Sequence, residues 1–139
     1  MMIDASMKQL LADKAREETN KAYSPYSEFN VGCALLCEDR SVYTGCNIEN
    51  ASYSATMCAE RVALFSAVKD GKRDFTAIAI AGRKRNGNFE KCAPCGVCLQ
   101  TLSEFLKGEA IVLLVNEDGY DEYRFSELLP ISFSSLNLR

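Results

Sequence analysis

The sequence contains no histidine and no tryptophan, and only three of its 139 residues are proline. The absence of histidine matters most, because it excludes Ser–His and Cys–His nucleophile systems and every imidazole metal ligand. A metal ion would have to be held by thiolates or carboxylates, and a carboxyl group becomes the natural candidate for moving protons. The chain also lacks the roughly 20 consecutive apolar residues that a membrane span requires, so we expect no membrane partner.

Basic residues are slightly fewer than acidic ones, 16 against 19, which gives a formal net charge of −3. Basic residues gather only briefly, at 83–85 and at 69–73, and we interpret both groups as solvated loops and helix ends. This balance argues against a groove for nucleic acid. The segment 1–11 carries Asp4 and lacks a cleavable apolar core, so we expect no secretion signal and a cytoplasmic location. The length suits one domain, 1–139, with a single core.

Hydrophobic periodicity predicts an α-β-β-α-β-α-β-β order of elements. We expect helices at 4–22, 57–70 and 94–107, and strands at 31–37, 41–46, 75–81, 110–115 and 120–125. Pro94 suits the first position of the third helix, and Gly108 suits the position after its end. The pattern predicts an α/β protein in which a five-stranded mixed sheet carries helices on both faces.

Seven cysteines stand out in a chain of this kind, and the odd number argues against a disulfide framework. Two of them belong to the motif Pro94-Cys95-Gly96-Val97-Cys98, where a predicted helix begins. Free N–H groups and the helix dipole favour thiolates at that position. By itself this spacing is compatible with a zinc site, a redox pair or part of an iron–sulfur site.

A third cysteine belongs to Cys58-Ala59-Glu60-Arg61, at the start of another predicted helix. The two helix starts flank one buried strand, so Cys58, Cys95 and Cys98 could bind one Zn²⁺ and leave a fourth position for water. Arg61, one turn beyond Cys58, could donate to that sulfur and offset its charge. Glu60 is then the candidate proton carrier. Because residues two apart on an ideal helix point about 200° apart, Cys58 must lie at or before the helix cap.

These two motifs resemble the all-cysteine form of the zinc deaminase signature. Further segments resemble the small cytidine deaminases in particular, and the resemblance extends from about 22 to 133. These segments are Ser24–Ser27, Phe29–Gly32, Gly45–Tyr53, and Glu127–Pro130 with Phe133. The resemblance implies a three-layer α/β/α cytidine deaminase-like fold and one Zn²⁺ per subunit. It also implies hydrolytic deamination of free cytidine and deoxycytidine to uridine and deoxyuridine plus ammonia, in pyrimidine salvage.

The resemblance also implies roles for individual residues. Asn47 and Glu49 would hydrogen-bond the ribose hydroxyls, and Phe29 would lie against the nucleoside. Backbone groups near Ala59 and Cys95 would hold the exocyclic amine, while Glu60 would carry protons between water, N3 of the ring and the departing ammonia. Family members of this type form homotetramers with shared active sites. Three residues would then contact a ligand bound mainly by another subunit: Ala51, Tyr53 and Phe133.

The chain departs from the family pattern at Leu99, where the family usually has an arginine directly after the last zinc cysteine. One positive charge near the thiolates is therefore missing, which leaves more of the compensation to Arg61 and the helix dipoles. The remaining cysteines do not match ligand positions, and we expect three of them in strands or core and one in a loop. They are Cys33, Cys37 and Cys46, and then Cys92.

Three alternatives remain open at this point. Cys92 could join the other three thiols in a closed four-sulfur zinc or iron–sulfur site, which would make the protein a structural or electron-transfer module. The chain could instead be a related deaminase that acts on another aminopyrimidine compound such as blasticidin S, although the Asn47 and Glu49 pair favours a nucleoside. Editing of nucleic acid is a third alternative, disfavoured by the acidic balance. Cytidine and deoxycytidine are not distinguished, since both present a 3′-hydroxyl.

Overall fold

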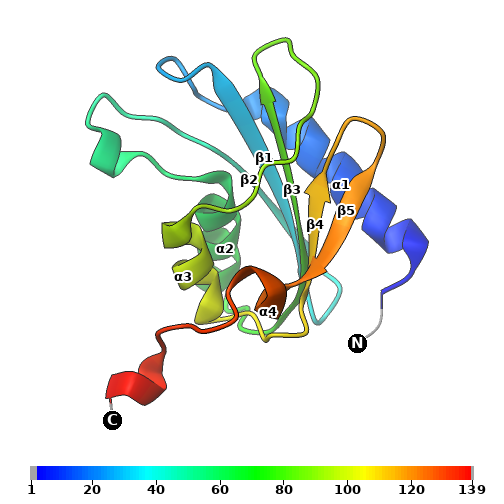
Figure 1. Ribbon diagram of the computed structural model, residues 1–139, viewed down its shortest axis with the longest axis vertical. Coiled ribbons are helices and arrows are strands. Elements are labelled where there is room, and N and C mark those ends of the chain that lie inside the picture. Colours follow the sequence, from blue (N-terminus) through cyan, green and yellow to red (C-terminus); the bar gives the residue numbers. More distant parts are fainter. Residues whose placement is uncertain (1–2, 139) are drawn as a thin grey trace.

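The computed structural model of the chain describes residues 3–138. Their core element is one sheet of five strands in the order β2-β1-β3-β4-β5 (Figure 1). The elements are α1 (Ala5–Glu18), β1 (Phe29–Cys37), β2 (Val42–Cys46), α2 (Ala59–Lys69), β3 (Phe75–Lys84), α3 (Gly96–Ser103), β4 (Ile111–Val115), β5 (Tyr120–Arg124) and α4 (Phe125–Leu128). Strands β3 and β4 pair in parallel and the other neighbours are antiparallel, which confirms the predicted mixed sheet.

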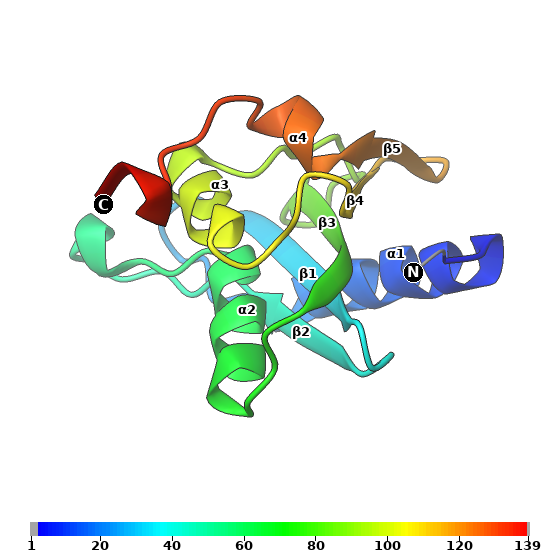
Figure 2. The same cartoon turned by 90° about the horizontal axis from the view of Figure 1, so that it is seen from below.

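The sheet separates two apolar clusters, because alternate side chains of each strand face opposite sides. On β3, Ile78 and Ile80 face the cluster that contains α2 and α3, whereas Ala77 and Ala79 face the cluster that contains α1. Helix α1 therefore covers one face and α2 with α3 covers the other (Figure 2). The predicted three-layer arrangement is confirmed. In the described part of the chain, no helix has the length and apolar character needed to cross a membrane.

The third helix differs from its prediction at both ends. It begins at Gly96 and not at Pro94, because Cys95 is extended (φ −71°, ψ 166°) and its sulfur accepts from the Cys98 N–H at 3.4 Å. Cys95 is thus the N-cap and Pro94 lies outside the helix. The helix also ends at Ser103, short of the expected residue 107.

Other boundaries shift for local reasons. The first helix is α-helical only to Glu18 and ends in a 3₁₀ turn over 19–21. Strand β3 continues three residues beyond its predicted end, because Lys84 pairs with Phe29 at the start of β1. The fourth helix, α4, was not expected from the sequence. It is a single turn directly after β5.

Helix α2 lies unusually close to the sheet at Gly45 of β2. A Cβ atom on Gly45 would lie 2.5 Å from the carbonyl oxygen of Ala59 and 2.6 Å from the backbone nitrogen of Ala63. Neither backbone atom can move independently of the helix. Glycine at this position therefore allows the first turns of α2 to rest directly on the strand.

We predict that Gly45→Ala lowers the free energy of unfolding by about 1–3 kcal/mol, because overpacking forces the helix away from the strand. Gly119→Ala is the matched control, since a Cβ there meets no atom within 4 Å. Urea denaturation of both variants measures the difference. Equal stability of the two variants would contradict the close approach of α2 to β2.

Candidate zinc and active site

Three thiols meet where α2 and α3 begin. Cys58 is the N-cap of α2 and Cys95 is the N-cap of α3, while Cys98 lies in the first turn of α3. Their sulfur atoms all lie within 4.8 Å of one another, and those of Cys58 and Cys95 are 3.9 Å apart. The structure therefore brings together the three cysteines that the sequence motifs singled out.

The spacing of these sulfurs fits a tetrahedral zinc ion. Zn–S bonds of about 2.3 Å place two sulfurs of a tetrahedron ~3.8 Å apart, close to the distance between Cys58 and Cys95. Among residues 3–138, Cys92 does not join the group. The geometry therefore favours three sulfur ligands with an open position over a closed four-sulfur site. Three sulfurs with an open position are typical of catalytic zinc.

The protein compensates part of the negative charge of the thiolates. Nη2 of Arg61 lies 3.5 Å from the sulfur of Cys58. A hydrogen bond from the Cys98 thiol and the one from Arg61 hold the pKa of Cys58 well below its usual range. The same hydrogen bond to Cys58 raises the pKa of Cys98. A bound dication would displace the protons of the thiols that hold it.

Glu60 is the second residue of α2 and is only 4% exposed. Burial, together with the nearby charge of Cys58, raises the pKa of Glu60 to about 7. A carboxyl group with a pKa near neutrality can both accept and release a proton, as general acid–base catalysis requires. The position of Cys58 at the cap also meets the geometric condition derived from the sequence, because Cys58 and Glu60 are not both within regular helix.

The remaining cysteines lie apart from this cluster of three. Cys33 and Cys37 are buried in β1 and Cys46 is half-buried in β2, as expected, and burial raises the pKa of all three. Leu99 is partly buried and packs against the apolar cluster on the α2 and α3 face. Leucine at this position therefore adds to the core.

Phe29 opens β1 and lies over Gly82 of β3. A Cβ atom on Gly82 would lie 3.0 Å from two ring atoms of Phe29 and 2.7 Å from the Cβ of Cys92. Cys92 comes three residues before Cys95, and burial together with the charge of Glu60 raises the pKa of Cys92 to about 11. The ring of Phe29 therefore belongs to the same end of the sheet as the cluster of three thiols.

Asn47 follows β2 and is buried, at 8% exposure. Its Oδ1 accepts from the Val31 N–H at 2.9 Å, and its Nδ2 donates to the Phe29 carbonyl at 2.9 Å. The side chain thus anchors the start of β1. One amide hydrogen remains for a ligand, since the NH₂ group carries two.

Glu49 accepts three hydrogen bonds from the turn that precedes β1. Its Oε1 accepts from the N–H groups of Tyr26 at 3.0 Å and Ser27 at 3.1 Å, and its Oε2 accepts from the Ser27 hydroxyl. Burial would raise the pKa of Glu49, but these hydrogen bonds and the charge of Arg85 lower it below its ordinary value. The carboxylate also faces a cavity of about 300 Å³ lined by Tyr26, Ser27, Glu49, Tyr53 and Thr56.

Sequence reasoning missed the part that Tyr26 and Ser27 play at this cavity. The segment Ser24–Ser27 contributed to the family resemblance, but no role was predicted for its individual residues. Its contact with Glu49 joins residues more than twenty positions apart, which no local pattern reports. The available signal was the hydroxyl and free N–H groups of a turn.

The other expected ligand contacts lie on peripheral segments or in the core. The side chain of Ala59 is fully buried, so only its backbone is available to a ligand. Ala51 and Tyr53 belong to the long segment that runs between β2 and α2 (Figure 1). Tyr53 is 74% exposed, and its ring lies 6.0 Å from that of Tyr26. Phe133 is exposed, and its carbonyl accepts from Gln100 of α3.

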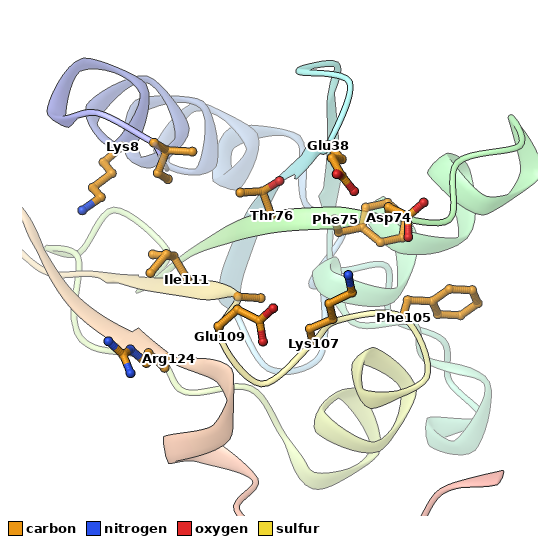
Figure 3. A pocket seen from close by; sticks show the side chains of 12 residues that line it. Lys8, Glu38, Asp74, Phe75, Thr76, Phe105, Lys107, Glu109, Ile111 and Arg124 are labelled. Carbon is orange, nitrogen blue, oxygen red and sulfur yellow. The ribbon is translucent and has the colours of Figure 1, made fainter. Parts of the chain in front are cut away.

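A larger cavity, of about 470 Å³, lies near the N-terminal ends of β3 and β4. Figure 3 shows basic and acidic side chains around it, among them Lys107, Arg124 and Glu109. Phe75, which begins β3, lines this cavity, whereas the other end of β3 pairs with Phe29. The predicted site residues lie away from it.

Comparison with known proteins places this geometry in a family. The family model for the cytidine and deoxycytidylate deaminase zinc-binding region matches residues 5–114. Cytidine deaminases of Sporosarcina psychrophila and Halalkalibacterium halodurans are 46% and 44% identical, over 95% and 92% of this chain and 94% and 95% of their own.

A solved structure gives the same result in three dimensions. The cytidine deaminase from Burkholderia pseudomallei has a TM-score of 0.83 at 40% identity, over 94% of this chain and 100% of that chain. The region matched by the family model runs from α1 into β4 and includes all three clustered thiols. The chain therefore belongs to the cytidine and deoxycytidylate deaminase zinc-binding family.

Proposed function

We propose that this protein is a zinc-dependent cytidine deaminase that converts free cytidine and deoxycytidine to uridine and deoxyuridine with release of ammonia, in pyrimidine salvage. The observation that carries the proposal is the cluster of Cys58, Cys95 and Cys98, spaced for one metal ion, with a buried glutamate at the same helix start. Zinc at this position supplies Lewis-acid activation of water at neutral pH.

The three cysteines and the residues beside them have distinct parts in this reaction. Cys58, Cys95 and Cys98 hold the metal, and Arg61 offsets part of their negative charge. Glu60 accepts a proton from the attacking water and delivers it to N3 of the pyrimidine. It then takes the proton of the hydroxyl formed at C4 and gives it to the amine, which leaves as ammonia while the C4 carbonyl forms. Its pKa near 7 suits both directions of proton transfer. Backbone groups at the two helix starts, near Ala59 and Cys95, hold the exocyclic amine.

Nucleoside recognition belongs to the segments next to the cluster. The ring of Phe29 provides an apolar face for the base. Asn47 donates a hydrogen bond from its remaining amide hydrogen to the ribose 3′-hydroxyl, and the Glu49 carboxylate accepts a hydrogen bond from that hydroxyl. A donor and an acceptor placed together favour a sugar hydroxyl, which carries both functions.

We further propose that the protein acts in the cytoplasm as a homotetramer with shared active sites, to which Ala51, Tyr53 and Phe133 contribute across subunits. Ile131 is 92% exposed and Leu138 is 77% exposed, which supports burial of the C-terminal segment by another copy. Leu128 and Leu129, which precede this segment, instead pack partly against the core of their own chain. The sheet includes strands from most of the chain, which supports 1–139 as one domain.

We predict that the zinc-loaded protein deaminates cytidine and deoxycytidine, and that Glu60→Gln lowers kcat by about 10²–10⁴-fold while it retains zinc, because the amide cannot carry protons. The loss of ultraviolet absorbance on deamination measures the rates, with CMP as a third substrate. A zinc-loaded wild type that converts none of the three compounds would contradict the proposal.

We predict that Cys58→Ala, Cys95→Ala and Cys98→Ala each lose the bound zinc, whereas Cys92→Ala keeps one zinc ion per chain. The reason is that only three sulfurs meet in the cluster. Elemental analysis of the purified variants gives the stoichiometry. Loss of zinc from Cys92→Ala would instead indicate a closed site with four sulfurs.

A further inference from the structure

The carboxylate of Glu49 is held by one short turn of the chain. Its Oε1 accepts two backbone N–H groups, from Tyr26 and Ser27, whereas for Oε2 the turn provides only the hydroxyl of Ser27. Rotation of the carboxylate about its last bond would break the contact with Ser27. The Ser27 hydroxyl therefore sets the plane of the carboxylate and the direction of its remaining lone pairs.

The same hydroxyl also contacts the start of β1. Its oxygen accepts from the Phe29 N–H at 3.0 Å while its hydrogen goes to Glu49. The acceptor side and the donor side of one hydroxyl are thus both used. The Phe29 N–H thus holds the Ser27 hydroxyl in one orientation, with its hydrogen toward Glu49.

The turn that presents Ser27 is itself fixed from the opposite side. The Arg85 N–H donates to the Glu28 carbonyl at 2.8 Å, and the Arg85 guanidinium donates to the Ser24 carbonyl at 2.9 Å. Glu28 has φ +56°, in the left-handed region, and its N–H donates to the Ser24 carbonyl at 3.0 Å. A turn held by three such hydrogen bonds places the Ser27 hydroxyl before any ligand arrives.

We propose that Ser27 is a positioning residue for nucleoside recognition, which directs the Glu49 carboxylate toward the ribose 3′-hydroxyl. The inference rests on the function proposed above and assigns to that site a residue that does not itself touch the base. Its consequence is selective. A nucleoside with a 3′-hydroxyl depends on Ser27, and a nucleoside without one does not.

The test compares deoxycytidine with 2′,3′-dideoxycytidine on the zinc-loaded, full-length protein. For Ser27→Ala we expect KM for deoxycytidine to rise about tenfold with little change in kcat, because a hydrogen bond to a charged group is lost. For dideoxycytidine we expect kcat/KM to change by less than about twofold, since the contact that Ser27 supports is absent from that substrate. Equal losses on the two substrates would overturn the inference.

Three further variants separate the possible causes. Ser27→Thr keeps a hydroxyl and should restore KM to within about threefold of the wild type; failure of this rescue, with a loss equal to that of Ser27→Ala, contradicts the inference. Ser41→Ala is the matched control, because that hydroxyl also donates to a carboxylate, Asp39, but in the turn between β1 and β2. It should leave both substrates unaffected, and a selective loss for deoxycytidine in this control would also contradict the inference.

Glu49→Gln distinguishes the inference from the function on which it rests. If Glu49→Gln loses more activity on deoxycytidine than on dideoxycytidine but Ser27→Ala does not, the role of Ser27 alone is overturned. If neither variant loses more activity on deoxycytidine than on dideoxycytidine, both the sugar contact of Glu49 and the role of Ser27 are overturned. Activity on deoxycytidine itself, measured in the wild type, tests the deaminase function separately from either result.

Discussion

The structure depends on one electrostatic constraint, which is that three thiolates must lie within a few ångströms of one another. Thiolates repel, so they are stable together only where positive charge surrounds them. The chain meets this requirement with the positive dipole ends of α2 and α3 and with Arg61, and at α3 the Cys98 N–H also donates to the Cys95 sulfur. The mixed sheet makes this possible, because β3 separates the two helices in sequence and both follow strands of the same sheet.

The same arrangement decides how Glu60 behaves. At the first turn of α2 it is buried by the packing of that helix on the sheet, and burial raises its pKa toward neutrality. A glutamate at an exposed helix start would remain ionised at neutral pH and would release a proton poorly. The close approach of α2 to Gly45 thus bears on the acid–base role that we propose for Glu60 as well as on the fold. Packing and acid–base properties have one origin here.

Much of this could be predicted from the sequence, but only where the signal is local. The order of helices and strands follows from periodicity, and the position of Cys58 at a helix cap follows from the angle between Cys58 and Glu60. The rule for proline misplaced the start of the third helix, because Cys95 caps it through its own sulfur. The hydrogen bonds of Glu49 and Asn47 depend on chain segments that meet only after folding, so no local pattern could reveal them.

Helix capping by sulfur has a further consequence for the substitutions that the cap position tolerates. The side chain that ends a helix is normally replaceable by serine, threonine, aspartate or asparagine with modest loss. At Cys95, whose sulfur accepts from the Cys98 N–H, an oxygen cap would preserve the secondary structure while removing a soft donor that suits zinc. One sulfur at Cys95 therefore serves both the helix cap and the zinc site that we propose.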